Sequence, residues 1–193
     1  MALSHALLTS LLEKSSSGYD LARRFDKSIG FFWHATHQQI YRELGRMELA
    51  GWIASSSAPD AGKTRKRIYR VLPPGQAELL RWAAEPSAPM DLRDELMVRL
   101  RADAALGSLD LAPELARRIA LHQEKLALYR EIEQRDFAAG ATMARAASIH
   151  HMILKKGILY EENSIAWARE MLDLLKKKSR RKNASRQTPK TGV

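Results

Sequence analysis

The side chains best suited to reading a nucleic acid lie in one stretch, Trp33 to Trp52, with the sequence WHATHQQIYRELGRMELAGW. Apolar residues spaced by four and three positions predict an amphipathic helix here, namely Ile40, Leu44 and Met47. At 100° per residue, Gln38 and Arg42 fall within about 20° of the side opposite that stripe. Glutamine amides pair well with adenine, and arginine guanidinium groups pair well with guanine. The outer side of this helix is therefore a candidate DNA-reading surface.

The predicted helix has clear limits at both ends. Thr36 and Gln39 stand in the positions of a capping box, in which each side chain satisfies the backbone N–H of the other residue. Gly51 is well placed to end the helix in the left-handed conformation. The ring of Tyr41 either brings its hydroxyl to a phosphate or packs against the preceding helix. We expect the N-terminal half to meet DNA through Thr36, His37, Gln38, Gln39, Tyr41 and Arg42.

A basic hairpin is predicted directly after this helix. Residues 52–54 and 67–72 have the composition of short strands, and the segment between them contains proline, aspartate and glycine as turn residues. Placed beside a reading helix, such a hairpin is a wing, and its cations suit phosphates or the minor groove. Its candidate DNA contacts are Lys63, Arg65, Lys66 and Arg67, with Arg70 further along the second strand.

Two more helices are predicted ahead of the reading helix. Residues 3–13 carry leucines at helical spacing, and Ser17 to Asp20 match a capped helix start. Apolar residues continue from there at helical spacing as far as Ile29, and Gly30 is predicted to end the second helix. Three short helices followed by a basic hairpin predict a winged helix-turn-helix head over residues 1–85.

Other kinds of chemistry find little support in the sequence. The chain has no cysteine, so disulfides and thiolate metal sites are excluded. His34 and His37 have no third ligand nearby, and the neighbours His150 and His151 must point to different sides of a helix. The carboxylates of residues 161 and 162 are expected on a helix surface without a cleft. Because the phosphate-binding and hydrolase motifs are also absent, we predict a protein that is not an enzyme and needs no metal or cofactor.

The net charge of +10 is unevenly distributed along the chain. It divides into +5 for residues 1–75, −3 for residues 76–175 and +8 for residues 176–193. This division indicates a head that binds a polyanion, a body that does not, and a basic tail. No segment approaches the roughly 20 apolar residues of a membrane helix, and the N-terminus is a poor signal peptide. We expect a soluble cytoplasmic protein with no membrane partner.

The second half of the chain is predicted to be almost wholly helical. The prolines and lack of periodicity at residues 85–89 mark a domain boundary, and residues 91–175 are expected to form an all-α dimerisation domain. A long helix should begin at Pro113, and Gly157 is expected to break a later one. Positions 115, 119, 122, 126 and 129 repeat like a coiled-coil seam. The candidate dimer contacts are Leu115, Ile119, Leu126, Tyr129, Trp167 and Met171.

Two features of this half allow more than one interpretation. Residues 176–193 lack periodicity and apolar content, so we predict a disordered basic tail that is either merely solvated or adds non-specific DNA affinity. A set of aromatic side chains could line an effector pocket, although helical spacing favours core or dimer interface. This set comprises Trp82, Tyr129, Tyr160 and Trp167, and the methionines are candidates for the same pocket.

Several segments, in this order, resemble the PadR family of bacterial transcriptional regulators. SGYDLARRFD from Ser17 is similar to its second-helix start, and THQQIYRELGRMELAGWI from Thr36 is similar to its recognition helix. Residues 67–71 followed by Gly75 resemble its wing strand and the next helix start. LRDELMVRL and GILYEENSIAWAREMLDLL resemble C-terminal segments of the subgroup related to a virulence-gene activator. The resemblance covers roughly residues 3–175.

The resemblance implies a homodimer that is held by its C-terminal helices and places two winged heads on a palindrome-like operator of double-stranded DNA. It also implies a transcriptional regulator, which we expect to be a repressor that a small, phenolic effector releases. The alternative is a helical interaction module whose winged head binds a protein partner instead of DNA.

Overall fold

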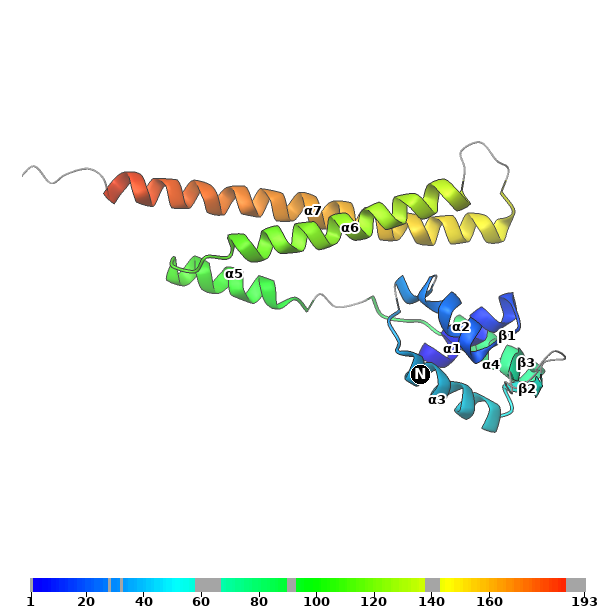
Figure 1. The fold of residues 1–193 in the computed structure, drawn as a ribbon. Coiled ribbons are helices and arrows are strands. Elements are labelled where there is room, and N and C mark those ends of the chain that lie inside the picture. Colours follow the sequence, from blue (N-terminus) through cyan, green and yellow to red (C-terminus); the bar gives the residue numbers. More distant parts are fainter. Residues whose placement is uncertain are drawn as a thin grey trace, which may run out of the picture. The chain divides into compact units, whose positions relative to one another are not determined.

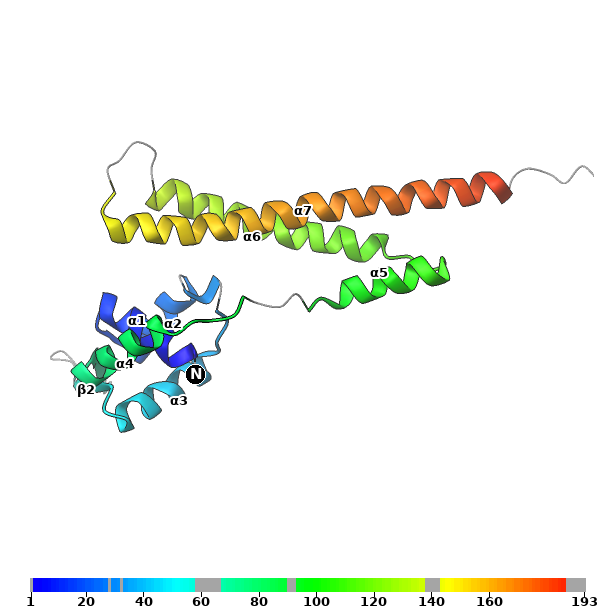
Figure 2. The same ribbon diagram turned by 180° about the vertical axis from the view of Figure 1, so that it is seen from behind.

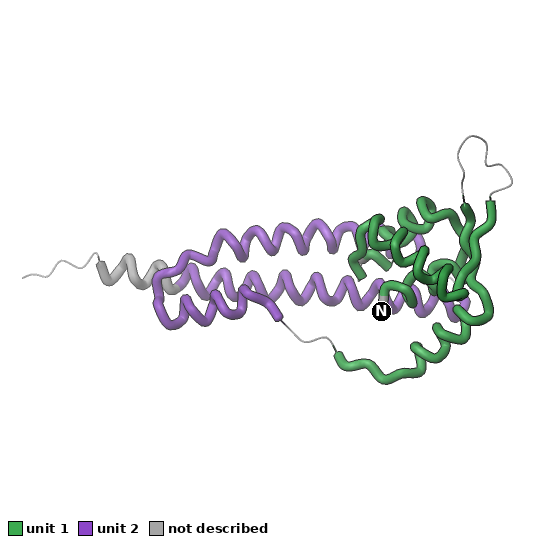
Figure 3. Tube along the Cα trace, turned by 90° about the horizontal axis from the view of Figure 1, so that it is seen from below, with its two compact units in different colours: residues 1–90 green, residues 91–193 purple. Residues whose placement is uncertain are grey.

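The computed structural model describes residues 2–27, 29–31, 33–57, 67–89, 93–137 and 143–186. The chain divides into two compact units, residues 1–90 and 91–193, which we call the head and the body (Figure 3). The described residues are mainly helical with one small antiparallel sheet, which confirms the predicted fold class (Figures 1 and 2). Among the helices described, none combines the length and the apolar composition needed to cross a membrane.

The head is a winged helix-turn-helix. Its elements are α1 (Ala2–Glu13), β1 (Ser16–Ser17), α2 (Gly18–Asp26), the 3-10 turn η1 (Ile29–Phe31), α3 (His37–Leu49), β2 (Ile53–Ser57), β3 (Arg67–Val71) and α4 (Pro73–Ala84). The hairpin β2–β3 was predicted, but β1 was not. Because β1 pairs with β3 through Ser16 opposite Tyr69 and Ser17 opposite Ile68, the strand order is β1-β3-β2.

One apolar core holds the head together. The helices α1, α2 and α3 each bury one side in it, and Ile53 at the start of β2 joins them. On α3 the buried residues are the predicted stripe of Ile40, Leu44 and Met47. Burial of such side chains contributes about 1.5–3 kcal/mol each, so the core fixes how α3 is presented.

The limits of α3 agree with the sequence at the level of single atoms. The capping box between Thr36 and Gln39 is present, and Gly51 adopts a positive φ of 70° directly after the helix. The helix runs from His37 to Leu49, inside the limits that the predicted cap at Thr36 and the predicted stop at Gly51 set. Likewise α2 ends at Asp26, ahead of the predicted stop at Gly30, and η1 follows it.

A buried polar contact joins the first and last helices of the head. The Nε2 atom of His5 on α1 lies 3.0 Å from Oε1 of Glu78 on α4, and the His5 ring stacks on Trp82 at a centroid distance of 4.5 Å. Hydrogen bonds from Arg81 and His5 lower the pKa of the Glu78 carboxyl to about 2. The end of the head that leads into the body is therefore fixed to α1.

The body consists of three helices, α5 (Glu95–Leu106), α6 (Ala112–Asp136) and α7 (Arg145–Arg186). Helices α6 and α7 lie side by side in both ribbon views (Figures 1 and 2). They are antiparallel, since His122 on α6 contacts Glu161 on α7 while Glu133, further along α6, contacts His151, earlier on α7. A small core of Leu96, Leu115 and Ala168 joins all three helices.

Two predictions for the last helix were wrong. Gly157 does not break α7, which is one helix of 42 residues. A side chain there would place its Cβ 2.9 Å from Cε2 of Tyr129, so the glycine makes room for that ring. The predicted disordered tail also begins too early, since α7 continues through Arg186. The remainder of that tail, residues 187–193, lies outside the described residues.

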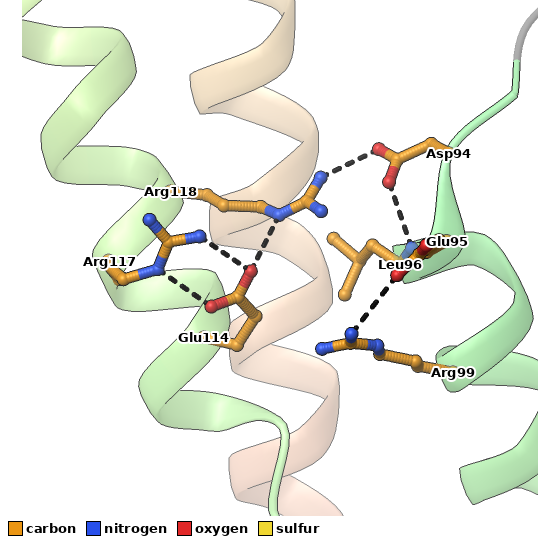
Figure 4. A network of polar contacts seen from close by, with 7 residues as sticks. All are labelled: Asp94, Glu95, Leu96, Arg99, Glu114, Arg117 and Arg118. Carbon is orange, nitrogen blue, oxygen red and sulfur yellow. Dashed lines mark hydrogen bonds and ion pairs between the residues drawn. The ribbon is translucent and has the colours of Figure 1, made fainter.

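A network of charged side chains fastens α5 to α6 (Figure 4). Asp94 caps α5 by accepting from the Leu96 N–H at 2.9 Å, and it also accepts from Arg118 on α6 at 2.7 Å. Both contacts, that of Arg118 first, hold the pKa of the Asp94 carboxyl below its usual range. Glu114 accepts from Arg117 and Arg118, which lower its pKa to about 2. The first described turn of the body is thus anchored in one position on α6.

Candidate nucleic-acid interface

Two of the predicted DNA contacts, Thr36 and Gln39, form hydrogen bonds with each other that stabilise the first turn of α3. Thr36 accepts the Gln39 N–H on its hydroxyl at 3.2 Å, and its own N–H donates to Gln39 Oε1 at 2.8 Å. These bonds satisfy backbone donors that a helix start otherwise leaves free. Thr36 and Gln39 therefore stabilise the start of α3. The Thr36 hydroxyl oxygen and Oε1 of Gln39 already accept backbone hydrogen bonds there and are not free for bases.

Two further predicted contacts hold α3 against α2. The Nε2 atom of His37 lies 2.8 Å from Oδ2 of Asp26, the last residue of α2. At the other end of α2, a Cβ added to Gly18 would lie 2.5 Å from Cε1 of Tyr41, so that ring lies against the start of α2. This places the ring of Tyr41 in the packing position, one of the two alternatives left open by the sequence. The two contacts fix the angle between the helices of the helix-turn-helix.

Gln38 and Arg42 remain as candidates for base contacts, and we call them the reading pair. Both side chains are exposed on the outer side of α3, and neither forms a hydrogen bond or ion pair with any described residue. Residues four apart on a helix share one face and are separated by about 6 Å along its axis. The pair therefore presents an amide and a guanidinium, two groups suited to base edges, one turn apart on a helix with a fixed orientation.

The predicted wing contacts divide into two groups. Lys63, Arg65 and Lys66 lie outside the described residues. Arg67 is described, and its guanidinium donates to both carboxylate oxygens of Glu48 on α3, at 3.0 and 3.2 Å. Its guanidinium carbon also lies 5.9 Å from the centre of the Tyr69 ring. Arg67 is thus paired within the head, contrary to its expected availability for a phosphate.

Two exposed residues on α2, Tyr19 and Arg23, are further candidates that the sequence did not predict. Tyr19 is 57% exposed directly after the capped start of α2, and the guanidinium carbon of Arg23 lies 5.7 Å from the centre of its ring. In helix-turn-helix proteins the helix before the recognition helix crosses the DNA backbone. A tyrosine hydroxyl and an arginine at this place suit phosphate oxygens. The available signal was the position of Tyr19 next to Ser17, the N-cap of α2.

Most predicted dimer contacts are engaged inside the body. Leu115 and Tyr129 are buried within the chain, while Ile119 and Met171 pack against the small core and Leu126 is half-buried. The predicted seam on α6 therefore faces α7 of the same chain, and it is not a free surface for a partner. Trp167, in contrast, is 38% exposed on α7.

A different apolar surface is open on α7. Its exposed members, which we call the α7 stripe, are Ile149, Ile153, Tyr160, Trp167 and Leu174. At 100° per residue all of them lie within about 40° of Tyr160, and the stripe extends over about 38 Å. The last four are seven residues apart, which is the repeat of a coiled-coil seam. The residues of α7 that pack inside the body, such as Ile158 and Ile165, lie on a different side of the helix.

The remaining candidates for other chemistry have structural partners. Glu161, predicted on the surface, is instead buried, with Oε2 2.5 Å from Nδ1 of His122 and Oε1 3.4 Å from the Lys125 ammonium. Glu162 accepts from Arg130 at 2.6 Å. In the part of the chain that the structure describes, no group of three or more metal-binding side chains could hold an ion. The aromatic side chains proposed for a pocket are divided between the head, with Trp82, and the body.

Comparison with known proteins gives two family matches and two full-length relatives. The family described as "Transcriptional regulator PadR-like family" matches residues 7–81, and "Virulence activator alpha C-term" matches residues 92–176. A probable transcriptional regulator of Mycobacterium tuberculosis is 42% identical over 191 residues, which cover 92% of this chain and 100% of that protein. The negative transcriptional regulator PadR of Bacillus subtilis is 26% identical over 178 residues, covering 91% of this chain and 98% of that protein.

Solved structures agree over the same length. PadR of Bacillus subtilis in complex with operator DNA matches with a TM-score of 0.79 and 25% identity, covering 90% of this chain and 98% of that one. The Vibrio cholerae virulence activator AphA matches with a TM-score of 0.76 and 30% identity, covering 91% and 98%. PadR in complex with p-coumaric acid has a TM-score of 0.72 at 24% identity, covering 91% and 99%, and that match concerns the fold.

Proposed function

Because this chain belongs to the PadR-like family of transcriptional regulators, and is therefore not an enzyme, we propose that it represses its target genes by binding one operator as a homodimer in the cytoplasm. The observation that carries this proposal is the reading pair, Gln38 and Arg42, which is exposed and has no partner among the described residues. Each head would place this pair in the major groove of one half-site.

Phosphate contacts would hold each head in register on the duplex. On α2 the candidates are Tyr19 and Arg23, whose guanidinium carbon lies 5.7 Å from the centre of the Tyr19 ring. On the wing, Arg70 is exposed on β3, and the sequence places further cations between the strands. Contacts of this kind supply affinity that does not depend on sequence and falls steeply with salt concentration. Preference for one operator would then come from the reading pair.

The α7 stripe supports the homodimer. Five large apolar side chains on one side of a helix, between 38% and 61% exposed, form a surface of a kind that soluble proteins seldom leave open to water. Its seven-residue spacing suits packing against a second helix of the same kind. A symmetric dimer formed in this way would carry two heads, as a palindrome-like operator requires.

Mutation of the reading pair tests the DNA-binding proposal. After a genome-wide map of bound DNA has supplied the operator, we expect Arg42→Ala to weaken operator binding by about 5- to 150-fold, the value of one good base contact. Affinity for a random duplex should change much less. Fluorescence anisotropy on both duplexes at matched salt measures the two affinities.

The matched control is Arg46→Ala, which removes the same charge from an exposed position one turn beyond Arg42, in the C-terminal half of the helix, where it is paired with Glu43. We expect it to affect the operator and the random duplex to a similar, small extent. If the wild-type protein binds operator and random duplex equally at matched salt, the proposal of sequence-specific regulation is wrong, and a protein partner for the head becomes the better interpretation.

Release by a small effector is the second part of the proposal. It is supported by the structure of the Bacillus subtilis relative in complex with p-coumaric acid. If this chain responds to phenolic acids, its melting temperature should rise with the concentration of p-coumaric acid, because only binding to the native state has that effect. Cinnamic acid, which lacks the phenolic hydroxyl, is the matched compound. An unchanged melting temperature at millimolar p-coumaric acid would contradict a phenolic effector of this type.

A further inference from the structure

One carboxylate on α3 is bonded to both strands of the wing. Oε1 of Glu48 accepts the Ser55 N–H at 3.1 Å and the Ser55 hydroxyl at 2.6 Å, and Ser55 belongs to β2. The same carboxylate accepts from the guanidinium of Arg67, the first residue of β3, at 3.0 Å. We call this group of three residues, Glu48, Ser55 and Arg67, the wing clamp.

The register of the hairpin explains why these side chains meet. Ser55 pairs with Tyr69 and Ser57 pairs with Arg67, and side chains alternate between the two faces of a strand. Ser55 and Arg67 therefore lie on the same face of the hairpin, the face that meets Glu48. Arg70, an odd number of residues from Arg67, lies on the opposite face. The two arginines of β3 thus have different surroundings.

The wing clamp is the outermost hydrogen-bonded link between α3 and the described part of the hairpin. The other attachments are apolar, since Ile53 enters the core from β2, and Tyr69 and Val71 pack against it from β3. On the other side of β3, the link to β1 consists of two residue pairs. Among the described residues, the hydrogen bonds between the hairpin and α3 are those of the wing clamp. Its angle to α3 therefore depends on the wing clamp.

We propose that Glu48 and Arg67 are positioning residues for DNA binding, which hold the wing at the angle where its cations and the reading pair meet one duplex together. This inference rests on the proposed DNA-binding function. It assigns Arg67 a different role from the phosphate contact that its charge and place in the wing suggest. It also gives a role to the Glu48 carboxylate, whose negative charge would by itself repel the DNA phosphates.

The proposal reverses the sign that simple electrostatics predicts. Removing a negative charge near DNA strengthens attraction to the phosphates, so a passive Glu48 would give tighter binding when replaced by alanine. A positioning Glu48 gives weaker binding, because the wing is no longer held. For Arg67, loss of a phosphate contact would weaken binding and lower the slope of log affinity against log salt by about 1 in Arg67→Ala alone. Loss of positioning weakens binding in Glu48→Ala as well, and changes the slope by a similar amount in both variants, because the same wing cations lose their contact with the duplex.

The experiment compares full-length variants Glu48→Ala, Glu48→Gln, Arg67→Ala and the double alanine variant on the operator duplex, over a series of salt concentrations. We expect each single alanine variant to bind on the order of ten-fold more weakly, and the two variants to share one salt slope. Glu48→Gln keeps an oxygen that can accept from Ser55 and should lose less. The double variant should have about the same operator affinity as whichever single alanine variant binds more weakly. All three variants lose the same contact between Glu48 and Arg67, so the losses should not add.

Glu43→Ala is the matched control, since it removes the same charge from α3 at a residue paired with Arg46 and not with the wing. It should not weaken binding. Tighter binding by Glu48→Ala, a salt slope about 1 lower in Arg67→Ala than in Glu48→Ala, or additive losses in the double variant would each overturn the proposal. These outcomes differ from failure of the proposed function itself, in which the wild-type protein would not distinguish the operator from random DNA.

Discussion

Replacing Trp167 with glutamate is expected to convert the protein to a monomer and to lower its operator affinity by at least about 100-fold. Trp167 lies near the middle of the α7 stripe and is 38% exposed in the single chain. A charge placed there would be buried without a partner in the dimer, at a cost of several kcal/mol. In a symmetric interface the cost arises twice. Sedimentation gives the mass, and operator titration gives the loss of the second half-site.

The control for this change lies on the neighbouring residue. Ala166 is also exposed, but it points about 100° away from Trp167 around the helix. Ala166→Glu introduces the same charge outside the α7 stripe, so we expect it to leave the protein dimeric with unchanged operator binding. A Trp167→Glu variant that remains a dimer would show that the interface lies on another surface of the body.

The second large effect is expected from Gly75→Ala, which should destabilise the head by at least about 2 kcal/mol. Gly75 is buried in the first turn of α4, and a Cβ there would come closer to the Trp52 carbonyl oxygen than real side chains come to any atom. That oxygen belongs to the backbone and already accepts from Leu72, so it has little freedom to move. For a head of about 90 residues, this loss lowers the melting temperature by roughly 8–16 °C.

Gly45→Ala is the matched substitution, and it is expected to raise the stability of the head instead of lowering it. Gly45 is also a helical glycine of the head, but an added Cβ would meet no atom within 4 Å. Alanine is the better helix former by about 0.5–1 kcal/mol, so this variant should melt at a higher temperature than the wild type. Thermal unfolding followed by circular dichroism measures both variants. Equal melting temperatures for the two would contradict the steric argument for Gly75.

The features that the sequence predicted well are those encoded over short distances. The apolar stripe of α3 repeats within two turns, and its capping box joins residues three apart, Thr36 and Gln39. The hairpin after it follows from turn residues between two short strands. Such signals need no knowledge of the rest of the fold, since the interacting atoms belong to neighbouring residues.

The features that the sequence missed depend on partners far along the chain. Strand β1 has only two residues, and it exists because β3 pairs with it from more than fifty positions away. Glu48 and Arg67 are separated by 19 positions, so the charge of Arg67 suggested a phosphate and not a carboxylate. At Gly157 the signal was interpreted as a helix break, whereas the reason for the glycine is the ring of Tyr129 on another helix.

Leu115 and Tyr129 were predicted as dimer contacts for a related reason. Helix periodicity identifies apolar faces, but it does not say which face meets a helix of the same chain and which meets a partner. Both α6 and α7 carry apolar residues on more than one side. The structure shows that Leu115 and Tyr129 are buried inside the body, whereas the α7 stripe is exposed in the single chain.

The capping box of α3 has a consequence for how operator preference can diverge between related proteins. It ties positions 36 and 39 to the start of the helix, so a change at either one alters folding before it alters base preference. The side chains at positions 38 and 42 form no hydrogen bond or ion pair with any described residue, so they can be replaced without altering the start of the helix. Under the proposed function, retargeting of this head to a new operator therefore has two positions to vary, one helical turn apart, while the capping box must be kept.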